Sequence, residues 1–371
     1  MPVTLDEVRP GLYDDSFAAR KSALVALGES GLRGDAEALA AVADRLHDES
    51  EDVRLAALRA LTLLAERGYE PAVLAALGRL GDENSYVRRG AVQALCPLAP
   101  RGEARALAAL VGRLGDEASH VRRAAAQALV ELAEAGDERA VAGLLGVLAD
   151  EATYVRSDAL QGLVALGRRG DARLLPAVLP LLEDGAAFVR GLALHMLPRF
   201  AERGDERAVL GAISCTRDED EQVRCCALQA LAQLTERGDE RALEGIEEHL
   251  QHETEDVRCS ALLLLGHVAP LGDKRFVKAA VGRLEDEAAA VRAAALEALA
   301  RCAQPGHDRT LSAMSVLLAD EDETVRCCAL HALGRAVERG DERLFMAATA
   351  GLEDGSQLVR DAAQQVLAQC A

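Results

Sequence analysis

Apolar residues along this chain follow a helical pattern that repeats every 34 residues without insertion or deletion. In the representative stretch 136–169, one apolar stripe falls at i, i+3, i+4 and i+7, which predicts a first helix over 138–148. The members of this stripe are Val141, Leu144, Leu145 and Leu148. A second stripe, formed by Val155, Ala159, Leu160, Leu163 and Leu166, predicts a second helix over 153–166. A short polar turn at 150–151 separates the two helices.

A Val-Arg pair marks the same place in every period, with Ala19 in place of Val in the first. The arginines are Arg20, Arg54, Arg88, Arg122, Arg156, Arg190, Arg224, Arg258, Arg292, Arg326 and Arg360. A strict period of this length indicates one small unit stacked on itself. Neither helix of a unit can bury its apolar face alone, so we expect neighbouring units to cover each other.

Two apolar positions of the second helix do not vary among the periods. The place of Ala159 is always Ala and the place of Leu163 is always Leu. A small residue lets neighbouring helices approach closely, and the leucine fills the space between layers. We therefore expect both rows in the core.

The junctions between periods carry glycine in all ten cases: Gly34, Gly68, Gly102, Gly136, Gly170, Gly204, Gly238, Gly272, Gly306 and Gly340. A glycine just past a helix end is typical of the left-handed C′ position. Aspartate follows it in seven of the ten junctions and is expected to cap the next helix. On this interpretation one helix ends and the next begins within about two residues.

An aspartate lies six residues before the repeated arginine in ten of the eleven periods, and His252 replaces it in the other. The row could be read as catalytic acids, but a catalytic site is not made eleven times over. We interpret it as a structural ladder. Each arginine is expected near aspartate and turn carbonyls of its own or the adjacent unit, with bidentate geometry.

These elements together resemble HEAT repeats. The resemblance rests on the D-x5-R element followed by A-x3-L, as at Asp150, Arg156, Ala159 and Leu163, and it covers essentially the whole chain. The nearest subtype is similar to the short repeats of phycobilisome-lyase-type proteins, whose junctions read like GDERA at 136–140. The resemblance implies an all-α, right-handed α-solenoid, an armadillo/HEAT-like superhelix, of eleven two-helix repeats. It also implies that the second helices line the concave surface.

The two ends of the chain are more polar than the repeats between them. The first helix over 4–12 carries charges and Pro10, and Gln364 stands where other second helices have an apolar residue. Terminal repeats need a polar outer face. We therefore expect a single array over 1–371, with 1–33 as the N-terminal cap and 340–371 as the C-terminal cap.

Charge and composition exclude several classes of function. The net charge of −19 argues against nucleic-acid binding, because phosphate contacts need a basic surface. No apolar stretch is long enough to span a bilayer, so no membrane contact is expected. The nine cysteines show no CxxC spacing, which favours reduced thiols in the cytoplasm. We expect a monomer.

The variable positions of the second helix are the informative ones for binding. Relative to the repeated Val, they lie one before it and two, six and ten after it, a spacing that places them on one face. The residues chosen as a protein-binding site are Tyr86, His120, Tyr154 and Phe188 (one before), Arg89 and Arg123 (two after), and Gln93, Gln127, Gln161 and His195 (six after). The aromatic row either packs on neighbouring turns or forms a binding stripe, since aromatic rings are enriched at interface hot spots. The charges counted at these positions nearly cancel, which predicts a near-neutral groove.

Two groups of residues could carry chemistry. Cys225, Cys226 and Cys259 permit a metal or redox interpretation, but small residues filling small places explain them better. His249 and His252 lie three apart and could share a metal, although we favour a substituted turn. No nucleotide-binding, metalloprotease or serine-hydrolase motif is found. We therefore expect no catalytic residue, no metal and no cofactor.

The sequence thus predicts a non-catalytic scaffold that binds a protein or peptide on its concave face. The alternative, suggested only by the repeat subtype, is a lyase or chaperone that acts on a pigment-carrying protein.

Overall fold

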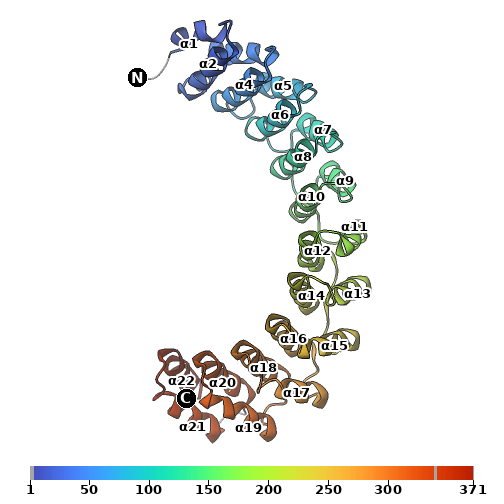
Figure 1. Cartoon of the computed structure of the whole chain (residues 1–371), viewed down its shortest axis with the longest axis vertical. Helices are drawn as coiled ribbons and strands as arrows, with labels where there is room; N and C mark the ends of the chain where they lie inside the picture. The colour runs from blue at the N-terminus through green and yellow to red at the C-terminus, as the bar shows by residue number, and fades with distance from the viewer. Residues whose placement is uncertain (1–3, 338–340, 371) are drawn as a thin grey trace. The chain divides into compact units, whose positions relative to one another are not determined.

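The computed structural model describes residues 4–337 and 341–370, and these residues form helices and turns without a strand. They divide into two compact units, residues 1–178 and 179–371, here called unit 1 and unit 2. Each unit is a stack of helix pairs (Figure 1). The predicted all-α solenoid is confirmed, while the count of eleven repeats and the single array over 1–371 stay predictions.

Unit 1 contains α1 (Leu5–Leu12), α2 (Phe17–Glu29), α3 (Ala36–Asp44), η1 (Arg45–His47), α4 (Glu51–Leu64), α5 (Glu70–Gly78), α6 (Ser85–Leu98), α7 (Ala104–Arg113), α8 (Ser119–Leu132), α9 (Glu138–Gly146), α10 (Thr153–Leu166) and α11 (Leu174–Val178). The η elements are single 3-10 turns that end a first helix. Even-numbered helices pack against one another in one layer, and the odd-numbered helices cover them (Figure 1).

Unit 2 contains η2 (Leu179–Glu183), α12 (Ala187–Phe200), α13 (Glu206–Cys215), α14 (Glu221–Leu234), α15 (Glu240–Glu247), η3 (Glu248–Gln251), α16 (Glu255–Val268), α17 (Lys274–Val281), α18 (Ala289–Cys302), α19 (Asp308–Val316), η4 (Leu317–Ala319), α20 (Glu323–Ala336), α21 (Glu342–Gly351) and α22 (Gln357–Cys370). The same two layers form here, with α12 to α22 of even number in one layer (Figure 1).

The apolar stripes predict the second helices better than the first. The expected second helix over 153–166 coincides with α10, whereas the expected first helix over 138–148 ends earlier, at Gly146 of α9. Leu148 is nevertheless buried, because the turn after α9 folds back onto the stack. The apolar period therefore continues past the point where regular helical hydrogen bonding stops.

The two invariant rows lie in the core, as predicted. All eleven alanines of the Ala159 row are buried, from Ala23 to Ala363, and so are ten leucines of the Leu163 row. Leu367, in the last helix, is half-buried. Since aromatic residues are scarce, alanine and leucine of neighbouring second helices make most of this core.

The junction glycines have the predicted left-handed backbone conformation, but they do not lie at the helix C-terminus where it was predicted. Nine of them have positive φ, and the tenth, Gly340, lies outside the described residues. The prediction of a C′ glycine was wrong. The helix α4 ends at Leu64, Ala65 is extended, and Gly68 follows in a separate turn. Five residues, not two, therefore separate α4 from α5.

The glycine turn closes the end of a helix in the next repeat. The N–H of Gly68 donates to the carbonyl oxygen of Leu98, the last residue of α6, at 2.7 Å. Arg67 beside it donates to the carbonyls of Cys96 and Ala99, at 2.8 and 3.1 Å. Helix C-termini leave carbonyls without intrahelical partners. The junction therefore satisfies the neighbouring helix rather than its own.

The aspartates after the junction glycines cap first helices, as predicted. Six of them accept a backbone N–H at the start of their helix: Asp35, Asp137, Asp205, Asp239, Asp273 and Asp341. Glu103 and His307 fill the same position for α7 and α19. The start of the first helix is thus fixed locally.

The arginine–aspartate ladder joins each repeat to the next. Arg88 donates from Nε and Nη2 to the two carboxylate oxygens of Asp116 in the following repeat, at 2.9 Å each. Its Nη1 donates to the carbonyls of Asp82 and Glu83 in its own turn, at 2.9 and 3.1 Å. The same ion pair forms at Arg20–Asp48, Arg54–Asp82, Arg122–Asp150, Arg190–Asp218, Arg258–Asp286, Arg292–Asp320 and Arg326–Asp354. Arg54 and Arg258 make one hydrogen bond to the aspartate instead of two. Each of these guanidinium groups therefore holds its own turn and the next one together.

The ladder is electrostatically favourable in spite of its burial. Burial by itself raises the pKa of the Asp116 carboxyl, but the hydrogen bonds from Arg88 and from the Ala118 backbone outweigh it, and the pKa lies below its usual value. The pKa of Asp48 is lowered in the same way. Stability from these carboxylates is present above about pH 4 and is lost only as the pH falls further.

The ladder is interrupted in unit 2 at His252, which replaces the aspartate. Its Nδ1 accepts the N–H of Thr254 at 3.1 Å, as the aspartates accept the N–H two residues on. Arg224, in the preceding repeat, still donates to the carbonyls of Asp218 and Glu219. Among the described residues it has no carboxylate partner. Histidine thus preserves the turn but not the bridge between repeats.

Replacing Asp116 by alanine is expected to lower the free energy of unfolding by about 3–5 kcal/mol, because the buried Arg88 would lose its buried carboxylate partner and keep only the exposed Glu117. Urea denaturation of the full chain measures this change. The matched control is Glu117→Ala, since Glu117 also contacts Arg88 but its side chain is 83% exposed, against 2% for Asp116. That control should change stability by less than about 0.5 kcal/mol. Equal losses in the two variants would show that the ladder does not depend on the buried carboxylate.

Candidate functional site

The structure divides the predicted binding residues between the two units. Eight of them lie on α6, α8 and α10 of unit 1: Tyr86, Arg89, Gln93, His120, Arg123, Gln127, Tyr154 and Gln161. Phe188 and His195 lie on α12 of unit 2. All are exposed except His120, which is half-buried. The helical spacing therefore placed these side chains on the outer face of the second helices.

The aromatic row combines packing contacts with open ring faces. The rings of Tyr86 and His120 stack with centroids 5.0 Å apart. The Tyr154 hydroxyl donates to Ser119 Oγ in the preceding repeat, and the Arg123 guanidinium lies over the Tyr154 ring, 5.3 Å from its centroid. Phe188 is strongly exposed. The contacts of Tyr86, His120 and Tyr154 therefore support the packing interpretation. The exposed ring of Phe188 supports the binding interpretation.

Several charges of this face are neutralised within the face itself. Arg123 Nε and Gln127 Nε2 both donate to Asp158 Oδ2, at 2.9 and 2.8 Å. Lys21 Nζ pairs with Asp52 Oδ1 at 3.0 Å. Asp158 lies three after the repeated Val and was left out of the sequence-based charge count. Ion pairs therefore balance some of the charges on this face, while the near-neutral groove stays a prediction.

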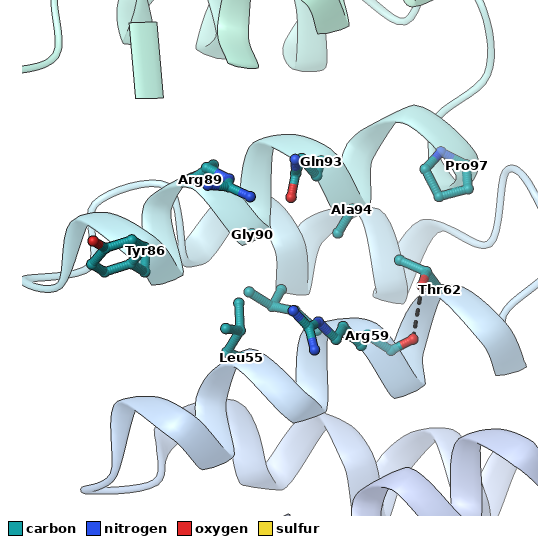
Figure 2. Close-up of a pocket in the computed structure, with 10 residues that line it drawn as sticks. Leu55, Arg59, Thr62, Tyr86, Arg89, Gly90, Gln93, Ala94 and Pro97 are labelled. Carbon is teal, nitrogen blue, oxygen red and sulfur yellow. Dashed lines mark hydrogen bonds between the residues drawn. The ribbon is translucent and has the colours of Figure 1, made fainter. Parts of the chain in front are cut away.

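A cleft between α4 and α6 collects three of the predicted residues. Its volume is about 380 Å³. The polar and aromatic side chains around it are Arg59 and Thr62 of α4 and Tyr86, Arg89 and Gln93 of α6. Figure 2 shows the α4 residues Leu55, Arg59 and Thr62 opposite α6, with Tyr86 at one end and Pro97 at the other. The cleft lies wholly within unit 1.

Gly90 allows α4 and α6 to form this cleft. A Cβ atom built on Gly90 would lie 2.5 Å from Leu55 Cδ1, closer than real contacts allow. The corresponding place is occupied by a residue with a side chain in every other repeat. Leu55 Cδ1 therefore lies close to the backbone of α6, where a larger residue at position 90 would force it to shift.

Two guanidinium groups in this cleft are unpaired. In the described part of the chain, neither the Arg59 nor the Arg89 side chain has a hydrogen bond or ion pair, and both are exposed. Thr62 Oγ1 donates to the backbone carbonyl of Arg59 at 2.7 Å, not to a side chain. Arg59 and Arg89 thus differ from Lys21 and Arg123, whose charges are balanced on the same face.

A smaller cleft of about 250 Å³ lies next to it, between α2 and α4. Its lining is mostly apolar and includes Leu24, Val25, Leu55 and Leu63. Leu55 and Arg59 line both clefts. The two clefts are therefore consecutive sites on one face of unit 1.

Sequence reasoning missed Arg59, Leu55 and Gly90 as members of the site. It ranked residues by rows of equal position, and these three belong to different rows. The signals available were the single glycine in its row and two arginines in consecutive periods at six and two after the Val. Only packing of α4 against α6 brings them into one cleft.

Burial raises the pKa of several cysteine thiols. The structure describes the side chains of eight of the nine cysteines, and these are free thiols. Burial, the largest cause, raises the pKa of Cys259 to about 11 and that of Cys96 to about 12, which keeps both protonated at neutral pH. In the ranges 4–337 and 341–370, no group of three or more His, Cys, Asp or Glu side chains could hold a metal.

His249 is buried beside the half-buried His252. Their ring centroids lie 6.1 Å apart, and His249 is 5% exposed with no hydrogen-bond partner for either ring nitrogen. Burial, with a smaller contribution from His252, Arg217 and Arg224, lowers the pKa of His249, while Glu248 opposes the shift. His249 stands where four other repeats carry an arginine that lies near the ladder aspartate, at Arg45, Arg79, Arg113 and Arg283.

No helix in the described ranges is long and apolar enough to cross a membrane.

Comparison with known families gives one clear result. The family model described as HEAT repeats matches residues 5–96, 70–164, 189–266, 211–300 and 277–368. A comparison with curated proteins gives no match. The predicted closeness to phycobilisome-lyase-type repeats stays a prediction.

Comparison with solved structures finds similar folds. A chain of the complex in which Kap95p binding changes the switch loops of RanGDP aligns with a TM-score of 0.63 at 13% identity, covering 98% of this chain and 55% of that one. Kap121p aligns with a TM-score of 0.64 at 12% identity, covering 98% and 45%. An engineered protein aligns with a TM-score of 0.48 at 20% identity, covering 98% of both chains. The chain spans about half the length of the two longer relatives.

Stability is expected to fall between pH 7.5 and 5.5 because of His249. A histidine with a lowered folded pKa binds fewer protons than the unfolded chain, so its stability contribution is full above about pH 6.5 and decreases as the pH falls. The expected loss is about 1 kcal/mol, measured by urea denaturation at both pH values. The ladder aspartates do not contribute in this range.

Two variants test the origin of this pH dependence. Two other repeats carry leucine at the position of His249, as Leu181 and Leu317. The His249→Leu variant therefore fits the fold and should remove the pH dependence of stability. His252→Asp restores the carboxylate opposite Arg224 and should raise the unfolding midpoint at pH 7.5. A wild-type midpoint that does not change between the two pH values would contradict the assignment to His249.

Proposed function

Because this chain belongs to the HEAT-repeat family, we propose that it is a non-catalytic scaffold that binds a protein or peptide on the face of its second helices. In HEAT arrays this face is the concave surface. The single observation that carries the proposal is the cleft between α4 and α6, where Tyr86, Arg89 and Gln93 meet on an otherwise regular stack.

The chemistry of the face supports a protein ligand over a small substrate. The cleft is open and shallow, with side chains from two helices and no group of residues arranged for proton transfer or nucleophilic attack. Tyrosine and arginine are the residue types most enriched at interface hot spots. The exposed rings of Tyr86 and Phe188 provide apolar contact area that a monomeric repeat does not need for its own core.

The structural relatives agree with this class of function. One of the similar chains belongs to a complex of Kap95p with RanGDP, in which one protein binds another. The similarity is in the fold alone, so it does not indicate which partner this chain binds.

The remaining predictions complete the proposal. The chain acts as a single array over 1–371, as a monomer in the cytoplasm, without cofactor and without contact to nucleic acid or membrane. The net charge of −19 favours solubility and self-repulsion, and it disfavours phosphate backbones.

Substitution of the aromatic row is expected to abolish partner capture. The test is an affinity pull-down from the source cell with wild type and the triple variant Tyr86→Ala, Tyr154→Ala, Phe188→Ala, both checked by circular dichroism. A matched control removes three exposed apolar side chains from first helices and their caps: Tyr69→Ala, Val316→Ala and Phe345→Ala. We expect the control to capture the partner like wild type. A partner that both triple variants retain equally would place binding elsewhere.

A further inference from the structure

We propose that the two consecutive clefts of unit 1 read one extended segment of a partner protein. The α4/α6 cleft binds a carboxylate side chain of this segment, and the α2/α4 cleft binds an apolar side chain three residues away. This inference rests on the proposed scaffold function and makes its ligand specific.

The unpaired arginines select the carboxylate. On the second-helix face of unit 1, Lys21 and Arg123 are neutralised by Asp52 and Asp158. Arg59 and Arg89 are not paired within the described residues, although both line the same cleft. Guanidinium groups form their strongest hydrogen bonds with carboxylates, often with two parallel contacts. A ligand carboxylate would complete here what aspartates complete elsewhere on this face.

The cleft also offers groups for the backbone and neighbouring atoms of such a ligand. The Gln93 side chain and the Tyr86 ring border it. Pro97 lies within α6, and because proline has no N–H, it cannot donate to the carbonyl oxygen of Gln93. That oxygen therefore lacks the i+4 donor that the other carbonyls of the helix interior have.

The neighbouring cleft has the opposite character. Val25 and Leu63 are 49% and 56% exposed at its rim, and Leu24 and Ala60 are buried in its floor. Of the charged groups in its lining, Lys21 and Asp52 are paired with each other, while Glu29 and Arg59 complete the lining beside the apolar residues. An aliphatic side chain that covers Val25 and Leu63 would remove apolar surface from water.

The spacing of the clefts sets the spacing of the two ligand side chains. Neighbouring packed helices lie about 8–10 Å apart. A polyproline II segment has three residues per turn and rises about 3.1 Å per residue, so residues three apart share a face at about 9 Å. The segment therefore reads Leu-x-x-Glu, or the same pair in the reverse chain direction.

Fluorescein-labelled peptides test this proposal by fluorescence anisotropy with the full-length protein. The probes are PPLPPEPP and the reversed PPEPPLPP, each with an amidated C-terminus so that the glutamate supplies the only carboxylate of the peptide, while the charge of the label is the same in every probe. Comparison probes carry Gln in place of Glu, Ser in place of Leu, or a four-residue spacing between Leu and Glu. We expect one Leu/Glu probe to bind about tenfold more tightly than its Gln counterpart. The altered spacing should weaken binding comparably.

Two sets of variants assign the contacts. Arg59→Gln with Arg89→Gln should reduce the affinity for the glutamate probe to that of the glutamine probe. Val25→Ser with Leu63→Ser should remove the preference for Leu over Ser. The matched control is Arg105→Gln on the first helix α7, an exposed arginine that is paired with Glu70 and Glu103, and it should leave both affinities unchanged.

The outcomes separate this inference from the scaffold function. Equal affinity for the Glu and Gln probes, or no binding of any probe at millimolar protein, overturns the two-cleft inference. A cellular partner that is lost by the aromatic triple variant but retained by the Arg59→Gln, Arg89→Gln variant also overturns it and leaves the scaffold function intact. If both variants lose that partner and the probes show the preference for Glu over Gln, the two-cleft inference and the scaffold function are both supported.

Discussion

The structure depends on a buried bidentate bond between an arginine of one repeat and an aspartate of the next. One guanidinium donates to two carbonyls of its own turn and to the carboxylate of the following turn, as Arg88 does between Asp82 and Asp116. The pair is removed from water, so an unmatched charge would be costly, whereas the matched pair fixes direction and distance. The apolar contacts of alanine and leucine supply attraction without direction. The ladder supplies the register in which they stack.

The junctions also join neighbouring repeats through hydrogen bonds. A helix that ends against its neighbour needs partners for its last carbonyls. The glycine turn provides them from the preceding repeat, with the Gly68 N–H on Leu98 and the Arg67 side chain on Cys96 and Ala99. The interface between repeats is therefore polar at both ends of the second helix and apolar in between. Because each rung of the ladder joins two neighbouring repeats only, a local exception such as His252 is tolerated at one interface.

The outer face of the second helices is free of these structural demands, and there the repeats differ. Some of its charges are paired internally, as with Arg123 and Asp158 or Lys21 and Asp52. Arg59 and Arg89 of unit 1 have no such partner in the described residues and are local centres of positive charge on a strongly acidic chain. A glycine and a proline on α6 shape the cleft around them. Binding specificity in such a scaffold thus arises where single residues differ from the repeat, because the residues that all repeats share pack the units against one another.

The sequence by itself determined the period, the second helices, the core rows, the capping aspartates and the existence of the ladder, because each depends on spacing within one repeat. It also placed the binding candidates on one helical face. It could not determine that the arginine reaches forward to the next aspartate, that Gly68 closes the next helix, or that Arg59, Leu55 and Gly90 meet in a cleft. These contacts join residues about 30 positions apart. Their geometry follows from how two helices pack, which no pattern along a single repeat specifies.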